Sequence, residues 1–420
     1  MRGLRATRRA GCSPSGSGQR RPVCIVVHAY YDEDPRVRRQ AEALVGAGRP
    51  VDVFALRRPG DLASEVVDGV NVHRLPVQRH QGADLSTYLR EYLTFFGRVV
   101  VALLRSHPTR RFAVAQVASI PDFLIFAALP LRVVGVPLVL DLHEAMPEMF
   151  RSRFPRMRNR LILGLVDLQE RLAIRAADAV LTANHPFAER LHRIGTPAGK
   201  VTVILNSPAL QRFDRAVHPE RPFMADETLR LVYTGALTPI YELDVLLEAA
   251  SQVASKLGPE QRVELHLYGR GDSRERLERR AAALGIADRV FFHGRIPLEE
   301  VAGAIAAADL GIAPTRADRF TEMTMSTKIF EYAIMGKPVV ASRLKAVERY
   351  FPPESLPLYR SGDSRDLARA ILTLVSDPAE RDVRNQRTER RVRELGWEEE
   401  ARRYVGFIED LAGDRVSSRP

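Results

Sequence analysis

The residues best suited to hold a phosphorylated ligand lie in residues 321–342, TEMTMSTKIFEYAIMGKPVVAS. The stretch predicts a polar loop, a short helix with a Ser-Thr cap, a stop at Gly336 and a buried strand. The amides and positive dipole end of a helix suit a phosphate, Lys328 would add charge, and Glu331 could accept two hydroxyl hydrogen bonds. These features fit a nucleotide diphosphate and its ribose. Taken alone, however, the stretch favours an ordinary amphipathic helix with a solvated Lys328–Glu331 pair.

Small and polar residues also stand where predicted strands end, which is where open α/β sheets bind ligands. After the strand at residues 263–268, the loop GRGD would let a ligand approach its backbone closely. It lacks the third glycine of a dinucleotide fingerprint, because Arg274 stands there, so a nicotinamide enzyme is disfavoured. A tight turn explains this loop at least as well. The residues at such strand ends are His28, Asp141, His143, Gly235, Gly269 and Gly294.

His143 follows the predicted buried strand at residues 137–142, in the sequence DLHE. A histidine there could hydrogen-bond a sugar hydroxyl or stabilise developing charge, although spacing alone favours a structural histidine. The order is not HExxH, which gives no support to zinc. An acidic pair flanks Glu33 at Asp32 and Asp34, as in some metal-dependent transferases, but capping of the next helix explains Asp34. We therefore predict no metal site.

The order of strand and helix patterns predicts two doubly wound α/β domains that face each other across a cleft. A first series begins with the strand at residues 23–28 and a second with the strand at residues 229–234. Residues 206–228, rich in Pro and Arg, are interpreted as the connection. The domain assignment is a disordered basic tail at 1–22, a first domain at 23–212 and a second at 213–396.

Length and composition agree with this organisation, because 420 residues exceed one ordinary core. Six arginines precede residue 23, so they account for 6 of the net +11 and leave about +5 for the folded part, which argues against nucleic-acid binding. Two cysteines give no disulfide framework, and no secretory leader is evident, so we expect a reducing, cytoplasmic location.

Two segments combine basic and apolar residues, at 151–165 and 88–105. Either could lie at an anionic membrane surface, or could be a core helix with a solvated basic face. The two interpretations are balanced for the first segment, and the core interpretation is favoured for the second. We therefore consider a peripheral position at the inner face of the cell membrane.

Taken together, the ordered motifs resemble the retaining glycosyltransferases of family 4, which have the GT-B fold. The resemblance rests on HAYYDEDPRVRRQAEAL, IPDFLIFAAL, DLHEAMPE, YTGALTPIYELDVLLEA, LYGRGD, FFHGRIP, AAADLGIAP and STKIFEYAIMGKPVVAS. It spans nearly all of residues 23–412. DLHEAMPE and TKIFEY are similar to the branch associated with bacterial cell-envelope and exopolysaccharide sugars.

By position, the resemblance implies that Glu331 binds the nucleotide ribose and that His143 lies near the donor sugar. It makes the second domain the nucleotide-sugar side and the first domain the acceptor side, with residues 397–415 returning to the first domain. The loops expected around the donor contain Gly235, Gly269, Gly294, Arg295, Ile296, Met325, Ser326 and Thr327. The acceptor-side loop contains His28, Tyr30, Asp34 and Arg36.

Four positions depart from the family pattern. Met323 stands where another glutamate is common, with Glu322 one residue away, and Glu242 replaces a usual glycine. An Arg and a Lys that often clamp the pyrophosphate are replaced by Ala236 and Tyr241. Lys328 is our candidate for the missing positive charge.

We therefore expect a metal-independent, retaining hexosyltransferase without a cofactor. It would move a sugar from a UDP- or GDP-linked donor to a glycan or lipid-linked acceptor, in cell-envelope polysaccharide or glycolipid synthesis. The alternatives are a GT-B-fold sugar-nucleotide epimerase, which would convert a donor without an acceptor, and a non-catalytic partner subunit, which would bind no donor.

Overall fold

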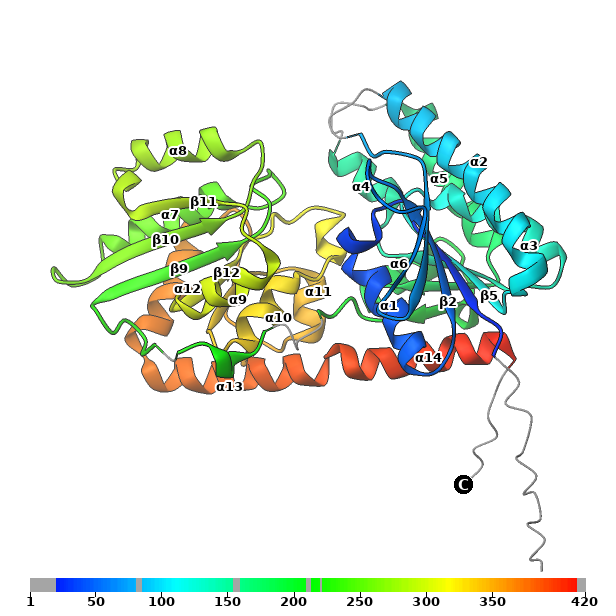
Figure 1. The fold of residues 1–420 in the computed structure, drawn as a ribbon. Helices are drawn as coiled ribbons and strands as arrows, with labels where there is room; N and C mark the ends of the chain where they lie inside the picture. Colours follow the sequence, from blue (N-terminus) through cyan, green and yellow to red (C-terminus); the bar gives the residue numbers. More distant parts are fainter. Residues whose placement is uncertain (1–19, 81–84, 154–158, 209–212, 220, 414–420) are drawn as a thin grey trace, which may run out of the picture.

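The computed structural model describes residues 20–80, 85–153, 159–208, 213–219 and 221–413. Two parallel sheets, each covered by helices on both faces, lie side by side (Figure 1). This arrangement confirms the predicted pair of α/β domains. The basic tail at residues 1–19, with Cys12, lies outside the described residues, as do residues 154–158 of the first basic segment.

The first sheet has eight strands in the order β3-β4-β2-β1-β5-β6-β7-β8, and only β3 runs antiparallel to its neighbour. Its central strands are buried on both faces, which explains their continuous apolar sequences. The strands are β1 (Val23–Val26), β2 (Val51–Leu56), β3 (Ser64–Val67), β4 (Val70–Leu75), β5 (Val114–Ala118), β6 (Leu138–Leu142), β7 (Ala179–Thr182) and β8 (Val201–Val203). Its helices are α1 (Pro35–Gly46), α2 (Leu85–Arg110), α3 (Leu129–Val133), α4 (Met146–Arg153), α5 (Arg160–Ala176) and α6 (His185–Arg193), together with the 3-10 segments η1 (Tyr31–Glu33) and η2 (Asp122–Ala128).

The second sheet has six parallel strands in the order β11-β10-β9-β12-β13-β14. They are β9 (Thr228–Thr234), β10 (Arg262–Tyr268), β11 (Val290–Gly294), β12 (Leu310–Ala313), β13 (Val339–Ser342) and β14 (Leu358–Tyr359). Its helices are α7 (Leu243–Ala254), α8 (Arg274–Ala283), α9 (Val301–Ala306), α10 (Thr327–Ile334), α11 (Lys345–Tyr350), α12 (Ser364–Ser376) and α13 (Pro378–Glu394).

The last helix, α14 (Trp397–Ala412), follows α13 after a break at Gly396 and runs beneath the first domain (Figure 1). Trp397, Tyr404 and Ile408 pack into the same apolar core as β1 and α1. The connection is also fixed by polar contacts, since the Leu205 amide donates to Glu400 at 2.8 Å. The chain therefore crosses between the two sheets twice.

The sequence patterns predicted most helices and strands correctly. The predicted and observed elements differ mainly at their ends. The first strand ends at Val26, two residues before the predicted end, although the Val27 amide still donates to the Phe54 carbonyl at 3.0 Å. The helix predicted over residues 297–308 is the short α9, preceded by a 3-10 turn. In α2, Phe95, Val99 and Leu103 are buried, which confirms the predicted core face of the second basic segment.

Candidate functional site

Three glycines close the carboxyl ends of neighbouring strands in the second sheet. Gly235, Gly269 and Gly294 have φ angles of 148°, 151° and 75°, which favour glycine. The Gly235 amide donates to the Tyr268 carbonyl at 2.8 Å, and the Gly269 amide donates to the Gly294 carbonyl at 2.7 Å. A Cβ atom on Gly269 would lie 1.8 Å from the Gly235 carbonyl oxygen. Only glycine therefore allows these loops to pack together at the sheet edge.

Lys328, in the first turn of α10, reaches the Gly235 loop. A Cβ atom on Gly235 would lie 2.7 Å from Lys328 Cε, so a side chain there would displace the lysine. The Lys328 ammonium lies 5.2 Å from the ring centroid of Tyr233 and 4.2 Å from that of Tyr241. Aromatic faces attract cations at such distances. The structure thus holds one positive charge where the sheet edge meets the start of α10.

The start of α10 also presents two further polar side chains, those of Ser326 and Glu331. Ser326 is the N-cap residue, but its side chain makes no capping bond, and its buried Oγ has no hydrogen-bond partner in the described part of the chain. One turn on, Glu331 is partly exposed. Burial raises the pKa of Glu331, although Lys328 and a hydrogen bond from Thr327 oppose that increase. The arrangement can offer helix amides, a hydroxyl, an ammonium and a carboxylate to one ligand.

The departures from the family pattern have structural explanations. Glu322 accepts a hydrogen bond from the Lys345 amide at 2.9 Å, so it caps α11. Met323 is buried in an apolar cluster with residues of the first domain. Glu242 accepts from Ser361 Oγ at 2.5 Å and from the Gly362 amide at 3.0 Å, which anchors the loop after β14.

In the first domain, His143 lies at the end of β6 and is largely buried. Its Nε2 atom is 2.8 Å from Asp141 Oδ1. The other Asp141 oxygen accepts hydrogen bonds from Gln40 at 3.1 Å and from Gln116 at 3.0 Å. Burial acts to raise the pKa of Asp141, but His143, Arg36 and Gln40 outweigh it and lower that pKa below its ordinary value. Asp141 is therefore an ionised carboxylate that orients the histidine.

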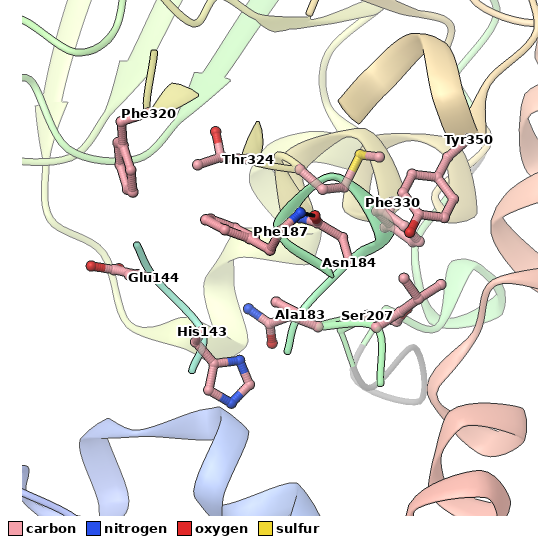
Figure 2. Close-up of a pocket in the computed structure, with 13 residues that line it drawn as sticks. His143, Glu144, Ala183, Asn184, Phe187, Ser207, Phe320, Thr324, Phe330 and Tyr350 are labelled. Carbon is pink, nitrogen blue, oxygen red and sulfur yellow. Dashed lines mark hydrogen bonds between the residues drawn. The ribbon is translucent and has the colours of Figure 1, made fainter. Parts of the chain in front are cut away.

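A cavity of about 150 Å³ separates His143 from the loop before α10. Figure 2 shows His143 and Glu144 on one side, with Phe320 and Thr324 on the other. Met325 also contributes to the lining. The cavity therefore lies between the domains and joins two of the predicted site residues.

The acceptor-side candidates are held by contacts within their own domain. His28 is enclosed by α2, with its Nε2 atom 3.1 Å from Glu91 and its ring edge-on to Tyr92. Burial lowers the pKa of His28 to about 4, against the opposing effect of Glu91. Tyr30 accepts from the Arg79 amide at 3.1 Å.

Asp34 and Arg36 form an ion pair at the start of α1. Asp34 accepts hydrogen bonds from the amides of Arg36 and Val37, which confirms it as the helix cap, and its carboxylate is 2.9 Å from the Arg36 guanidinium. The neighbouring Asp32 pairs with Arg58 at 2.9 Å. The carboxylates of Asp32 and Asp34 are thus both paired with arginines, and Asp34 also accepts hydrogen bonds from helix amides.

The structure places the candidate site residues in separate groups. Lys328 meets Gly235, while His143 and Met325 share the cavity. Arg295, which is exposed, and Ile296, which is partly buried, follow β11 and do not line this cavity. The loop predictions for these positions remain predictions.

Sequence patterns did not single out Asn184, which bridges the two domains. Its Nδ2 donates to the Met323 carbonyl at 2.7 Å, while its Oδ1 accepts from the Phe187 amide at 2.9 Å. The sequence did contain a signal for this residue. Asn184 follows the strand at Ala179–Thr182 and directly precedes His185-Pro186, so it stands at a strand end and at a helix cap, two positions where polar side chains are often functional.

Comparisons with known proteins agree with this geometry. Residues 34–207 match the family described as "Glycosyl transferase 4-like domain", and residues 228–377 match "Glycosyl transferases group 1". The first match covers the strands of the first sheet except β1, and the second match covers all strands of the second sheet. The chain therefore belongs to the glycosyltransferases with the GT-B architecture.

Two curated relatives match over most of their length. Alpha-D-kanosaminyltransferase of Streptomyces kanamyceticus is 26% identical, over 82% of this chain and 91% of that protein. D-inositol 3-phosphate glycosyltransferase of Streptosporangium roseum is 24% identical, over 88% of this chain and 87% of that protein.

Solved structures share the fold at lower identity. Sucrose-phosphate synthase from Thermosynechococcus elongatus superposes with a TM-score of 0.76 at 20% identity, over 94% of this chain and 100% of that one. Anabaena HepE in complex with UDP-glucose gives a TM-score of 0.64 at 16% identity, over 95% of this chain and 100% of that one.

Proposed function

We propose that this glycosyltransferase moves a hexose from a UDP- or GDP-linked donor to a hydroxyl acceptor, with retention of configuration at the anomeric carbon. The observation that carries the proposal is the contact of Lys328 with Gly235 at the start of α10, with Glu331 one turn further along the helix. In the proposed complex, Lys328 and the helix amides bind the diphosphate and Glu331 binds the ribose. The solved complex of HepE with UDP-glucose supports a donor of this class.

The proposed reaction needs no protein nucleophile, no metal ion and no cofactor. The bond between the anomeric carbon and the diphosphate oxygen breaks, and the acceptor oxygen bonds to the same face of the sugar. The acceptor proton passes to the departing diphosphate oxygen. Lys328 and the positive end of α10 stabilise the negative charge that develops on this oxygen. In the proposed complex His143 lies beside the donor sugar, a place supported by the cavity that His143 and Met325 both line.

The proposed acceptor is a glycan or lipid-linked molecule used in cell-envelope polysaccharide or glycolipid synthesis. Exposed leucines on α5 support an acceptor at a membrane surface: Leu161, Leu165, Leu168 and Leu172 recur every three or four residues, so they share one face. Arg160, Arg171 and Arg175 are exposed on the same helix. Among the described residues, no helix is both long and apolar enough to cross a bilayer.

A small cyclic polyol is the second candidate acceptor. It is favoured by the names of the relatives that match this chain, which include D-inositol 3-phosphate glycosyltransferase and 2-deoxystreptamine N-acetyl-D-glucosaminyltransferase. Such an acceptor would use the same cleft and donor.

The test is to incubate the chain with UDP- and GDP-hexoses, with inositol phosphate or lipid-linked saccharides, and with or without EDTA. We expect acceptor-dependent nucleotide release, a product whose NMR anomeric coupling matches that of the donor, and no loss of rate with EDTA. An inverted product or an EDTA-sensitive rate would contradict retention or metal independence respectively. Conversion of the donor to another sugar nucleotide without acceptor would instead support the epimerase alternative.

A further inference from the structure

A chain of buried hydrogen bonds, completed by a close contact between Asp141 and His143, links His143 to α14, the helix that follows the second crossing between the sheets. The Tyr404 hydroxyl on α14 donates to Gln116 Oε1 on β5 at 2.7 Å. Gln116 Nε2 donates to Asp141 Oδ2 at 3.0 Å, and Asp141 Oδ1 lies 2.8 Å from His143 Nε2. Tyr404, Gln116 and Asp141 are each fully buried, so water does not compete with these bonds.

The direction of each hydrogen bond between Tyr404 and Asp141 is fixed. Asp141 is ionised and can only accept, so the Gln116 amide atom that lies 3.0 Å from Asp141 Oδ2 is the nitrogen. The amide atom that faces Tyr404 is therefore the oxygen, and the Tyr404 hydroxyl donates to it. The Gln116 nitrogen is then left to donate to Asp141 and, at 2.8 Å, to Gln40 Oε1.

Asp141 transmits this order to the histidine. Its Oδ2 atom already accepts from Gln40 and Gln116, so Oδ1 is the atom that faces His143. An ionised carboxylate beside Nε2 selects the imidazole tautomer that carries its proton there. Nε2 of His143 faces Asp141, whereas Nδ1 has neither a hydrogen bond nor an ion pair in the described part of the chain, so Nδ1 is the nitrogen available to a ligand.

We infer that Tyr404 and Gln116 are positioning residues that fix the tautomer and ring orientation of His143. The inference rests on the proposed function, in which His143 lies beside the donor sugar, and it assigns part of that site to the carboxyl-terminal helix. Removal of the Tyr404 hydroxyl would free the Gln116 amide to rotate, and the bonds that hold Asp141 would loosen.

The test uses the Tyr404→Phe substitution in the full chain. In ¹⁵N–¹H spectra of histidine side chains, the His143 signal, assigned by its loss in His143→Gln, is expected to show the Nε2–H tautomer in the parent. It should show a mixture of tautomers in Tyr404→Phe. The turnover number for sugar transfer should fall roughly ten- to a hundredfold with little change in KM for the donor, because the proposed diphosphate and ribose contacts of Lys328 and Glu331 stay in place.

The matched control is Ile408→Val, since Ile408 is buried on the same helix and has no polar contact. It should lower the melting temperature while leaving the His143 signal and the turnover number at parent values. Gln116→Met should reproduce the effect of Tyr404→Phe, and the double variant should be no worse than Gln116→Met, because both changes break one chain.

An unchanged His143 tautomer in both Tyr404→Phe and Gln116→Met would overturn the inference. The spectra need no substrate, so they still test the hydrogen-bond chain if the parent fails to turn over any sugar nucleotide. That failure would count against the proposed function alone.

Discussion

At the scale of single residues, Lys328 carries the proposed phosphate contact. Replacement of Lys328 by Ala should weaken binding of a nucleoside diphosphate sugar by roughly tenfold or more, since hydrogen bonds to charged groups contribute about 1.5–3 kcal/mol. Affinity for the nucleoside alone should not change, because the lost contact is to phosphate. Isothermal titration calorimetry measures both values.

Lys256→Ala is the control for this substitution, because Lys256 is exposed beyond the end of α7. It removes the same charge from the same domain without approaching Gly235. Equal affinities of the parent and Lys328→Ala for the donor would refute the assignment.

Asp122 provides a prediction about pH. It is completely buried, and neither carboxylate oxygen has a hydrogen-bond partner in the part of the chain that the structure describes. Burial raises its pKa to about 8; Glu170 and Glu144 add to the increase, and Arg190 opposes it. The folded protein therefore keeps a proton on Asp122 that the unfolded chain releases near the ordinary pKa of an aspartate. Because of this difference, the free energy of unfolding falls as the pH rises toward 8.

Asp122→Asn should remove that dependence, which can reach about 1.4 kcal/mol per pH unit. Urea unfolding at pH 5 and pH 8 measures it as the difference between parent and variant. The free energy of unfolding of the parent should fall more steeply toward pH 8 than that of Asp122→Asn. Parallel changes in the two proteins would show that Asp122 is not protonated in the folded state.

At the scale of elements, α10 shows what local sequence could and could not predict. The stop at Gly336, with a φ angle of 70°, was predicted because a left-handed residue after a helix leaves a local signature. The aromatic contacts of Lys328 were not predicted, because Tyr233 in β9 and Tyr241 in the loop before α7 are far from Lys328 in sequence. Hydrogen bonds such as Tyr404–Gln116 join still more distant positions and leave no local pattern.

The exposed leucines of α5 form the element that the proposed membrane contact needs. Leu165 and Leu168 are 65% and 51% exposed, so replacing both by Ser should leave the melting temperature nearly unchanged. The same change should strongly reduce co-sedimentation with vesicles that contain anionic lipid, because apolar area and surface charge together drive such binding.

Val217→Ser is the matched control for the leucine pair, since Val217 is 70% exposed on the connection between the sheets. It should sediment with vesicles as the parent does. A parent that stays in the supernatant with every anionic vesicle would remove the membrane-surface proposal and favour the small polyol acceptor.

At the scale of the whole molecule, the two-domain architecture was predicted because alternating strand and helix patterns cover the chain. The side-chain contact between the domains was not predicted, because it depends on residues that meet only after both domains fold. Phe187, Ala145 and Ala183 of the first domain pack with Phe320 and Met323 of the second. An apolar Met323 therefore supports this contact between the domains at a position where the family often has a glutamate.

Met323→Glu should open this contact, because an unpaired carboxylate in an apolar cluster loses its hydration. We expect a larger radius of gyration by small-angle X-ray scattering and a lower melting temperature. Met323→Leu, which keeps volume and polarity, is the control and should cost less than about 1.5 kcal/mol. A radius of gyration unchanged by Met323→Glu would mean that other contacts hold the domains together.

Donor binding tests the central claim most directly. A thermal-shift titration of the parent and Glu331→Gln with UDP- and GDP-sugars is the measurement, because a ligand that binds only the folded state stabilises it by about 2.7 kcal/mol at 100 times its Kd. At least one sugar nucleotide should raise the melting temperature of the parent, and Glu331→Gln should need roughly tenfold more of it for the same shift. If no sugar nucleotide raises the melting temperature of the parent, the proposed donor site is contradicted.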